Sequence, residues 1–159
     1  MKTKKHIEFL RSLKACSTAI EFAETQYSFE DAIKNCPRGE WLLWLAQKMN
    51  CDLRLLTLAK GKCAETVIHL MKDERSINAV KVAIDFGEGK STLEELKAYA
   101  YASAASAAAA AAFAVAYAFA DSADSADAKE KNRLKTAEIC RDSLSTFLIE
   151  KYKSYNYGK

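Results

Sequence analysis

The sequence predicts an all-α protein: a single compact domain over residues 1–159, built as a multi-helix bundle around a long central helix. Residues 98–120 contain 15 alanines among 23 positions, and alanine is the best helix former and is depleted in strands. Elsewhere, apolar residues recur three and four positions apart, which is typical of helices that bury one face. A chain of 159 residues is long enough to bury a substantial core.

The alanine-rich run of residues 98–120 is predicted to be the central helix. At about 100° per residue its larger side chains divide onto two opposite faces. One face carries Tyr99, Ser103, Ser106, Phe113 and Tyr117, and the other carries Tyr101, Val115 and Phe119. A helix that is apolar nearly all round is usually enclosed by other elements. Because the run is poor in Leu and Ile and continues into Asp121, we do not expect it to span a membrane.

The remaining helices are expected on both sides of this run. Apolar spacing and turn residues predict helices, in chain order, over residues 6–13, 15–23, 28–36, 40–50, 52–61, 64–71, 74–86 and 128–152. Polar residues mark the expected helix starts: Ser17, Ser28, Asp52, Asp73 and a capping box formed either by Thr92 with Glu95 or by Ser91 with Glu94. Gly61 is either a break or a point of close helix packing.

The C-terminal third has no Gly or Pro between Lys90 and Gly158, so a break must come from other residues. Residues 121–127 are the expected break, since Ser and Asp offer caps. The inward side chains of the last helix are expected to be Leu134, Ala137, Cys140, Leu144, Phe147 and Leu148. Residues 153–159 are expected to form a frayed tail.

Composition restricts the classes of partner and the compartment. The net charge is +3, with 24 basic and 21 acidic residues, which is too balanced for a nucleic-acid polymer as partner. The five cysteines show no CxxC pair, and no signal peptide is apparent. We therefore expect reduced, mostly buried thiols in a cytoplasmic protein.

The chain resembles a family of bacterial and phage immunity proteins, whose all-helical domain is called immunity-protein-five-like. The matching segments are residues 15–17, 36–45, 63–70, 73–79, 87–89, the alanine-rich run and residues 137–141. One departure is Ser76, which stands where many members carry proline. The resemblance implies a non-enzymatic protein that neutralises a toxin or a defence effector by binding it.

Several residues are candidate binding residues for a partner or ligand. Arg75 could hold a carboxylate or phosphate, or could tie helices together through Asp52 or Glu65. Asp73 is expected to cap a helix, and His69 would share a face with it if the helix were continuous. Two histidines in the whole chain are too few for the usual metal sites, so no metal and no cofactor is expected.

Aromatic residues offer two further candidates. Trp41 and Trp44 stand on adjoining sides of one helix, either as core or as an exposed anchor for a partner. In an alternative function, Arg75 would line a pocket with Tyr99, Ser103 and Tyr117 that sequesters a small anionic, nucleotide-like defence signal. An enzyme of unrecognised type is a third alternative, and a homo-oligomer stays open. The sequence shows no nucleophile or metal motif that would identify an enzyme.

Overall fold

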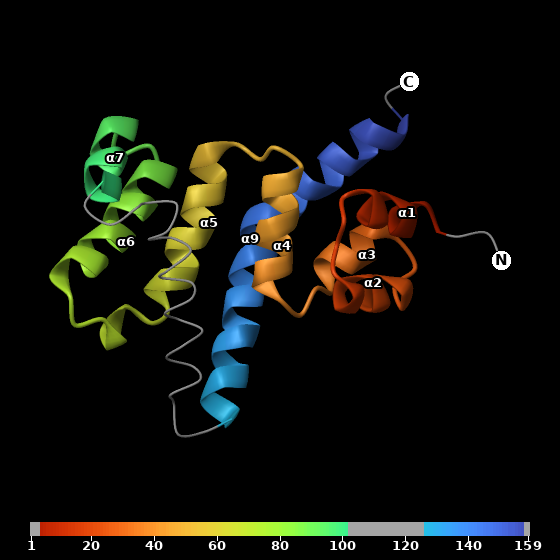
Figure 1. Ribbon diagram of the computed structural model, residues 1–159, viewed down its shortest axis with the longest axis horizontal. Coiled ribbons are helices and arrows are strands. Elements are labelled where there is room, and N and C mark those ends of the chain that lie inside the picture. The colour runs from red at the N-terminus through yellow and green to blue at the C-terminus, as the bar shows by residue number, and fades with distance from the viewer. Residues whose placement is uncertain (1–3, 102–125, 158–159) are drawn as a thin grey trace.

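The longest helix in the described part of the chain, α9 (Ala126–Tyr157), is the element on which the others are assembled. The computed structural model describes residues 4–101 and 126–157. Within these ranges the fold is all-α, with no strand, which confirms the predicted fold class. Figure 1 shows α9 passing alongside α4 (Gly39–Lys48) and α5 (Leu53–Glu65). The other elements occupy the two ends: α1 (Lys5–Ser12), α2 (Ser17–Glu24) and α3 (Phe29–Lys34) at one, and η1 (Ile68–Leu70), α6 (Glu74–Gly87) and α7 (Leu93–Tyr101) at the other.

A stripe of buried side chains fixes α9 against α4 and α5. Ala137, Cys140, Leu144 and Leu148 recur three and four residues apart, and each is 0% exposed. This spacing places them on one helical face. The facing helices supply small or flexible side chains, namely Ala46 from α4, Met49 at the C-cap of α4, and Ala59 and Cys63 from α5. The centre of the core is therefore the α4–α5–α9 contact.

Three glycines, Gly39, Gly61 and Gly87, allow the helices to approach closely. A Cβ at Gly39 would lie 2.8 Å from the carbonyl oxygen of Thr136 and 3.0 Å from Cys140 Sγ. A Cβ at Gly61 would lie 2.9 Å from Ile84 Cγ1. Gly61 is therefore a point of close packing between α5 and α6, and α5 continues through it to Glu65. The second of the two predicted roles for Gly61 is the one observed.

Local capping explains most helix starts. The carboxylate of Asp52 accepts from the N–H groups of Arg54 and Leu55, and Ser28 Oγ accepts from the N–H of Asp31. Thr92 and Glu95 form the reciprocal capping box at the start of α7. The start of α2 differs from the prediction. Its cap is Cys16, and Ser17 is already the first helical residue.

Other expectations require correction. The predicted helix over residues 64–71 is interrupted, because α5 ends at Glu65 and only the short η1 follows. Leu134 is 51% exposed rather than inward. The expected frayed tail is helical as far as Tyr157, and the Tyr155 ring lies 5.7 Å from the ring of Phe9. Packing against α1 thus orders part of the C-terminal end.

The central position predicted for the alanine-rich run falls mostly outside the described residues. Its first residues, up to Tyr101, belong to α7, and residues 102–120 are not described. In the described part of the chain, α4, α5 and α9 form the centre of the core. No helix in the described ranges has the length and apolar character needed to cross a membrane.

Candidate functional site

The four N-terminal helices enclose an apolar cavity, which we call the α1–α4 cavity. Its volume is about 320 Å³, within the range of small-molecule and side-chain pockets. The lining comes from all four helices and from the α1–α2 connection: Leu10, Lys14, Ala15, Cys16, Ala19, Phe22, Ala23, Phe29, Ala32, Ile33, Cys36, Glu40, Trp41, Leu42, Trp44 and Leu45. The alanines of α2 and α3 leave the space that larger residues would fill.

Both tryptophans of the chain line this cavity. Trp41 and Trp44 are each half-buried, so they are neither fully core nor fully exposed. The Trp41 ring lies 6.0 Å from the ring of Phe22, at an interplanar angle of 44°. The Arg38 guanidinium lies 5.1 Å from the centroid of the Trp41 ring, and Lys48 Nζ lies 6.0 Å from the centroid of the Trp44 ring. These cation–π contacts hold positive charge beside the aromatic walls.

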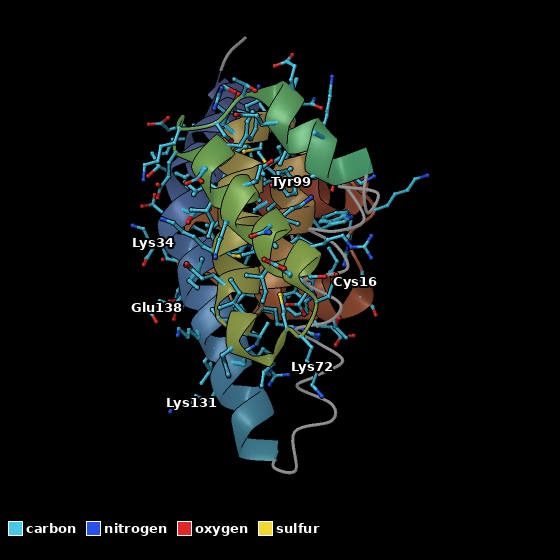
Figure 2. All side chains as sticks on the ribbon, turned by 90° about the vertical axis from the view of Figure 1, so that its left-hand side faces the viewer. Cys16, Lys34, Lys72, Tyr99, Lys131 and Glu138 are labelled. Atoms are coloured by element: carbon cyan, nitrogen blue, oxygen red, sulfur yellow. The ribbon has the colours of Figure 1, made fainter. Side chains whose placement is uncertain are left out.

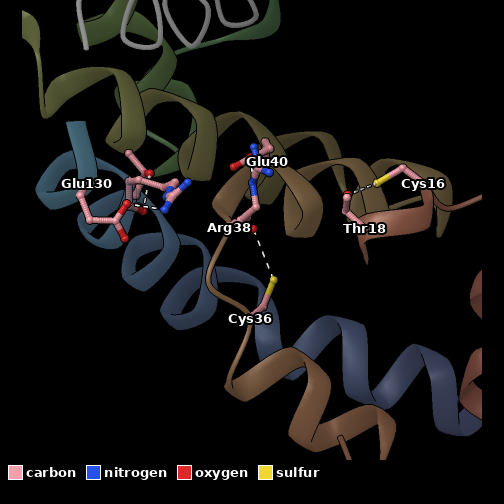
Figure 3. A network of polar contacts seen from close by, with 8 residues as sticks. Cys16, Thr18, Cys36, Arg38, Glu40 and Glu130 are labelled. Atoms are coloured by element: carbon pink, nitrogen blue, oxygen red, sulfur yellow. Dashed lines mark hydrogen bonds and ion pairs between the residues drawn. The ribbon is translucent and has the colours of Figure 1, made fainter. Parts of the chain in front are cut away.

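Polar groups of the cavity are few. Arg38 forms an ion pair with Glu40, whose side chain is 26% exposed. Cys36 Sγ donates to the carbonyl oxygen of Arg38 at 3.3 Å, and Arg141 donates to the carbonyl oxygen of Cys36 at 2.6 Å. Figure 3 shows the contacts of Cys36 and Arg38 close to the start of α4. The ion pair and the two hydrogen bonds fix the turn of residues 36–39. This turn sets where α4 begins, and therefore where Trp41 and Trp44 lie.

Cys16 is the exposed thiol of the cavity lining. It is the N-cap of α2, and its Sγ lies 3.4 Å from Thr18 Oγ1 (Figure 3). The hydrogen bond from Thr18, with a smaller contribution from the backbone N–H of Ala19, lowers the pKa of the Cys16 thiol. Burial has the opposite effect elsewhere and raises the pKa of Cys36 to about 11. Because the thiolate is the nucleophile, Cys16 is the more reactive of these two thiols.

The residues predicted around Asp73, namely His69, Asp73 and Arg75, are exposed in the structure. Asp73 caps α6 by accepting from the N–H groups of Arg75 and Ser76, as expected. The Arg75 side chain is 75% exposed and lies 3.8 Å from Asp73, so the predicted tie to Asp52 or Glu65 is wrong. His69 is exposed in η1, and the chain becomes extended at Met71 before α6 begins. His69 and Asp73 therefore do not share a continuous helix.

The nucleotide pocket predicted around Arg75 and Tyr99 is only partly described. Tyr99 lies on α7 and is 40% exposed. Figure 2 shows it well separated in height from Lys72, which precedes Arg75 by three residues. Ser103 and Tyr117 lie outside the described residues. Among the described residues, no group of three or more His, Cys, Asp or Glu side chains is arranged to hold a metal ion.

Comparison with known proteins adds no assignment. No family model, curated protein or solved structure matches this chain. The α1–α4 cavity is therefore the candidate site on the grounds of its geometry alone. Sequence reasoning found its tryptophan walls but missed Cys16 and the space beside it. The available signal was the row of small residues Ala15, Ala19 and Ala23, which lines the same cavity as Trp41.

Proposed function

We propose that this chain is a non-enzymatic binding protein of the immunity type, which neutralises a toxin or defence effector by binding it. The α1–α4 cavity would receive an apolar side chain of the partner protein. The observation that carries the proposal is an open apolar cavity walled by both tryptophans of the chain. The immunity role itself comes from the sequence resemblance described above.

The surroundings of the cavity suit a protein partner. Binding hot spots combine aromatic or Arg side chains with a pocket that excludes water, ringed by polar groups. Here Trp41 and Trp44 form the walls, and Arg38 and Lys48 lie against their rings. The carboxylate of Glu40 is held by Arg38. An apolar side chain of the partner would be removed from water when it enters the cavity. The charged side chains of Arg38, Glu40 and Lys48 would orient the partner.

The predominantly apolar lining also favours binding over catalysis. General acid–base catalysis requires a polar group within hydrogen-bond reach of the reacting atoms. The ionisable groups of the lining are Lys14, Cys16, Cys36 and Glu40, and the last three already have a hydrogen-bond or ion-pair partner. The nucleotide-sequestering alternative is supported less well, because Arg75 is exposed and its described ion pair is with Asp73.

The test is affinity capture from toxin-bearing and defence-bearing bacterial strains, using a matched set of variants. Ala19→Phe fills the cavity from α2, whereas Glu21→Phe adds the same ring at an exposed position of α2. The expected result is a protein retained at micromolar concentration by the wild type and by Glu21→Phe but lost from Ala19→Phe. Circular dichroism melting checks that each variant folds. Capture of nothing, or equal capture by Ala19→Phe, would contradict the proposal.

A further inference from the structure

We propose that Cys16 is a site of S-acylation, and that the acyl chain attached there occupies the α1–α4 cavity. The donor class is an acyl thioester, such as an acyl-coenzyme A. This inference goes beyond the proposed function, because it concerns the purified chain alone and needs no protein partner. An acyl chain in the α1–α4 cavity would exclude the partner side chain proposed above. Two independent features support it, one being the packing of four helices around a cavity and the other the placement of a nucleophile in its lining.

The placement of the thiol comes from the α1–α2 connection. Lys14 has a φ of 63°, which turns the chain sharply after α1. Cys16 is then extended, with φ −66° and ψ 156°, and becomes the N-cap of α2. The thiol is exposed to solvent yet contributes to the lining, one helical turn before Ala19. A reagent can therefore reach Cys16 from outside while its apolar end lies inside the cavity.

The nature of the cavity and of the thiol together select the ligand. The lining is mainly apolar, with Leu10, Ile33 and Leu45 beside the alanines and aromatic rings. Such a surface binds an apolar chain, and the thiol requires an electrophilic carbon at the end of that chain. An acyl thioester carries both parts in one molecule. Lys14, which also lines the cavity, places positive charge near the anionic coenzyme A portion.

The chemistry is a thioester exchange that needs no oxidant or reductant. The Cys16 thiolate attacks the carbonyl carbon of the donor and forms a new carbon–sulfur bond. The carbon–sulfur bond to the carrier then breaks, and the carrier leaves as its thiolate. The proton lost from Cys16 is taken up by that leaving thiolate through solvent. The products are acylated Cys16 and the free carrier thiol.

Other cysteines provide an internal reference. Cys36 is 3% exposed, and Cys63 and Cys140 are each 0% exposed. Cys51 is half-buried, and burial raises the pKa of its thiol to about 11. Cys51 does not line the cavity. Acylation directed by the cavity should therefore modify Cys16, whereas indiscriminate acylation on unfolding would also modify the other four.

The experiment compares decanoyl-coenzyme A with acetyl-coenzyme A on the purified full chain, by intact mass and peptide mapping. The expected result is one decanoyl adduct, on Cys16, formed at least roughly ten-fold faster than the acetyl adduct. About two buried methylene groups would supply that difference. Cys16→Ser should lose the adduct. Ala19→Phe should abolish the chain-length preference, while Glu21→Phe should keep it. Alkylation of Cys16 by iodoacetamide should change less than about two-fold in both α2 variants.

A second readout does not depend on the α2 variants. Because both tryptophans line the cavity, decanoylation should change their fluorescence, whereas acetylation should change it little. The proposal is overturned if no adduct forms, if the two donors react equally fast, or if Cys51 is acylated as fast as Cys16. It is also overturned if folded Ala19→Phe keeps the preference. Failure of the capture experiment would leave all of these results unaffected.

Discussion

Cys63 of α5 and Cys140 of α9 place their Sγ atoms 3.5 Å apart at the centre of the core, although 77 positions separate them in sequence. Both are free thiols, and both are 0% exposed. Their hydrogen bond, together with burial, raises the pKa of the Cys140 thiol. This pair therefore acts as two small apolar residues that let two helices approach, consistent with the reduced, buried thiols expected from the sequence.

The first prediction concerns the order of thiol reactivity. In the native protein, one thiol, Cys16, should react rapidly with iodoacetamide, and Cys63 and Cys140 should react only after unfolding. The reason is that the reagent needs an accessible thiolate. Because the pKa of Cys16 is lowered and that of Cys51 is about 11, the alkylation rate of Cys16 should reach half its maximum at a lower pH. Peptide mapping across a pH series measures both rates, and equal rates at Cys63 and Cys16 would contradict this order.

A second prediction tests the close approach of α4 to α9. Gly39→Ala should reduce the free energy of unfolding by about 1–3 kcal/mol, because the added Cβ meets the backbone of Thr136. Urea unfolding followed by circular dichroism provides the measurement. Thr146→Ala, at an exposed position of α9, is the control and should not lower the stability, because alanine is the better helix former. Equal stability of the two variants would show that α4 can move away from α9 without cost.

A third prediction concerns pH and His6. The side chain is 4% exposed, and its Nε2 lies 3.3 Å from the carbonyl oxygen of Ala23. Burial lowers the pKa of His6 below its ordinary value of 6.5. Below pH 6.5 the unfolded chain therefore binds a proton that the folded chain resists, so stability should fall as the pH drops. Above that pH the contribution of His6 is constant.

The matched variants for this pH dependence are His6→Gln and His69→Gln. His6→Gln removes the titrating group and should flatten the stability profile below about pH 6.5. His69 is exposed, so its replacement should leave the free energy of unfolding at neutral pH unchanged. Urea unfolding at fixed ionic strength measures the profile. A slope that survives in His6→Gln would assign the pH dependence to other groups.

A fourth prediction addresses the aromatic cluster between the two ends of the chain. The rings of Phe29 and Tyr152 are stacked, with centroids 4.0 Å apart and planes at 13°, and Phe9 meets both edge-on. Phe29→Ala should cost about 3–5 kcal/mol, since the side chain is 3% exposed. Tyr155→Ala should cost less, because Tyr155 is 55% exposed. Thermal unfolding compares the two, and a larger loss for Tyr155→Ala would be inconsistent with this packing.

The sequence predicts most of what is decided locally. The helix starts at Ser28, Asp52 and Thr92 follow from hydrogen bonds within four residues, so the residue types alone identify them. The inward placement of Leu134 is wrong because helical periodicity gives a face, while the extent of the facing helices decides how much of it is covered. Its position near the start of α9 leaves it 51% exposed.

The candidate site is harder to predict because it depends on space between helices. The spacing of Trp41 and Trp44 identifies them, but periodicity alone cannot distinguish a filled core from a cavity. The cavity exists because Ala19, Ala23 and Ala32 share its lining with the tryptophans, on elements whose relative placement depends on the whole fold. Cys16 could not be identified from the sequence for a related reason. A cysteine is a rare cap, and Ser17 offers the more usual choice one residue later.

The contacts between the first and last helices have a consequence for synthesis on the ribosome. Phe9 packs against Tyr152, and Arg141 donates to the carbonyl oxygen of Cys36 across 105 positions. Helices α3 and α4 both pack on α9, so the emerging N-terminal half lacks its partner until the last residues leave the exit tunnel. These helices therefore cannot complete their packing while the chain is still being synthesised. During synthesis the α1–α4 segment therefore lacks the apolar surface of α9, for a time that is set by translation of the rest of the chain.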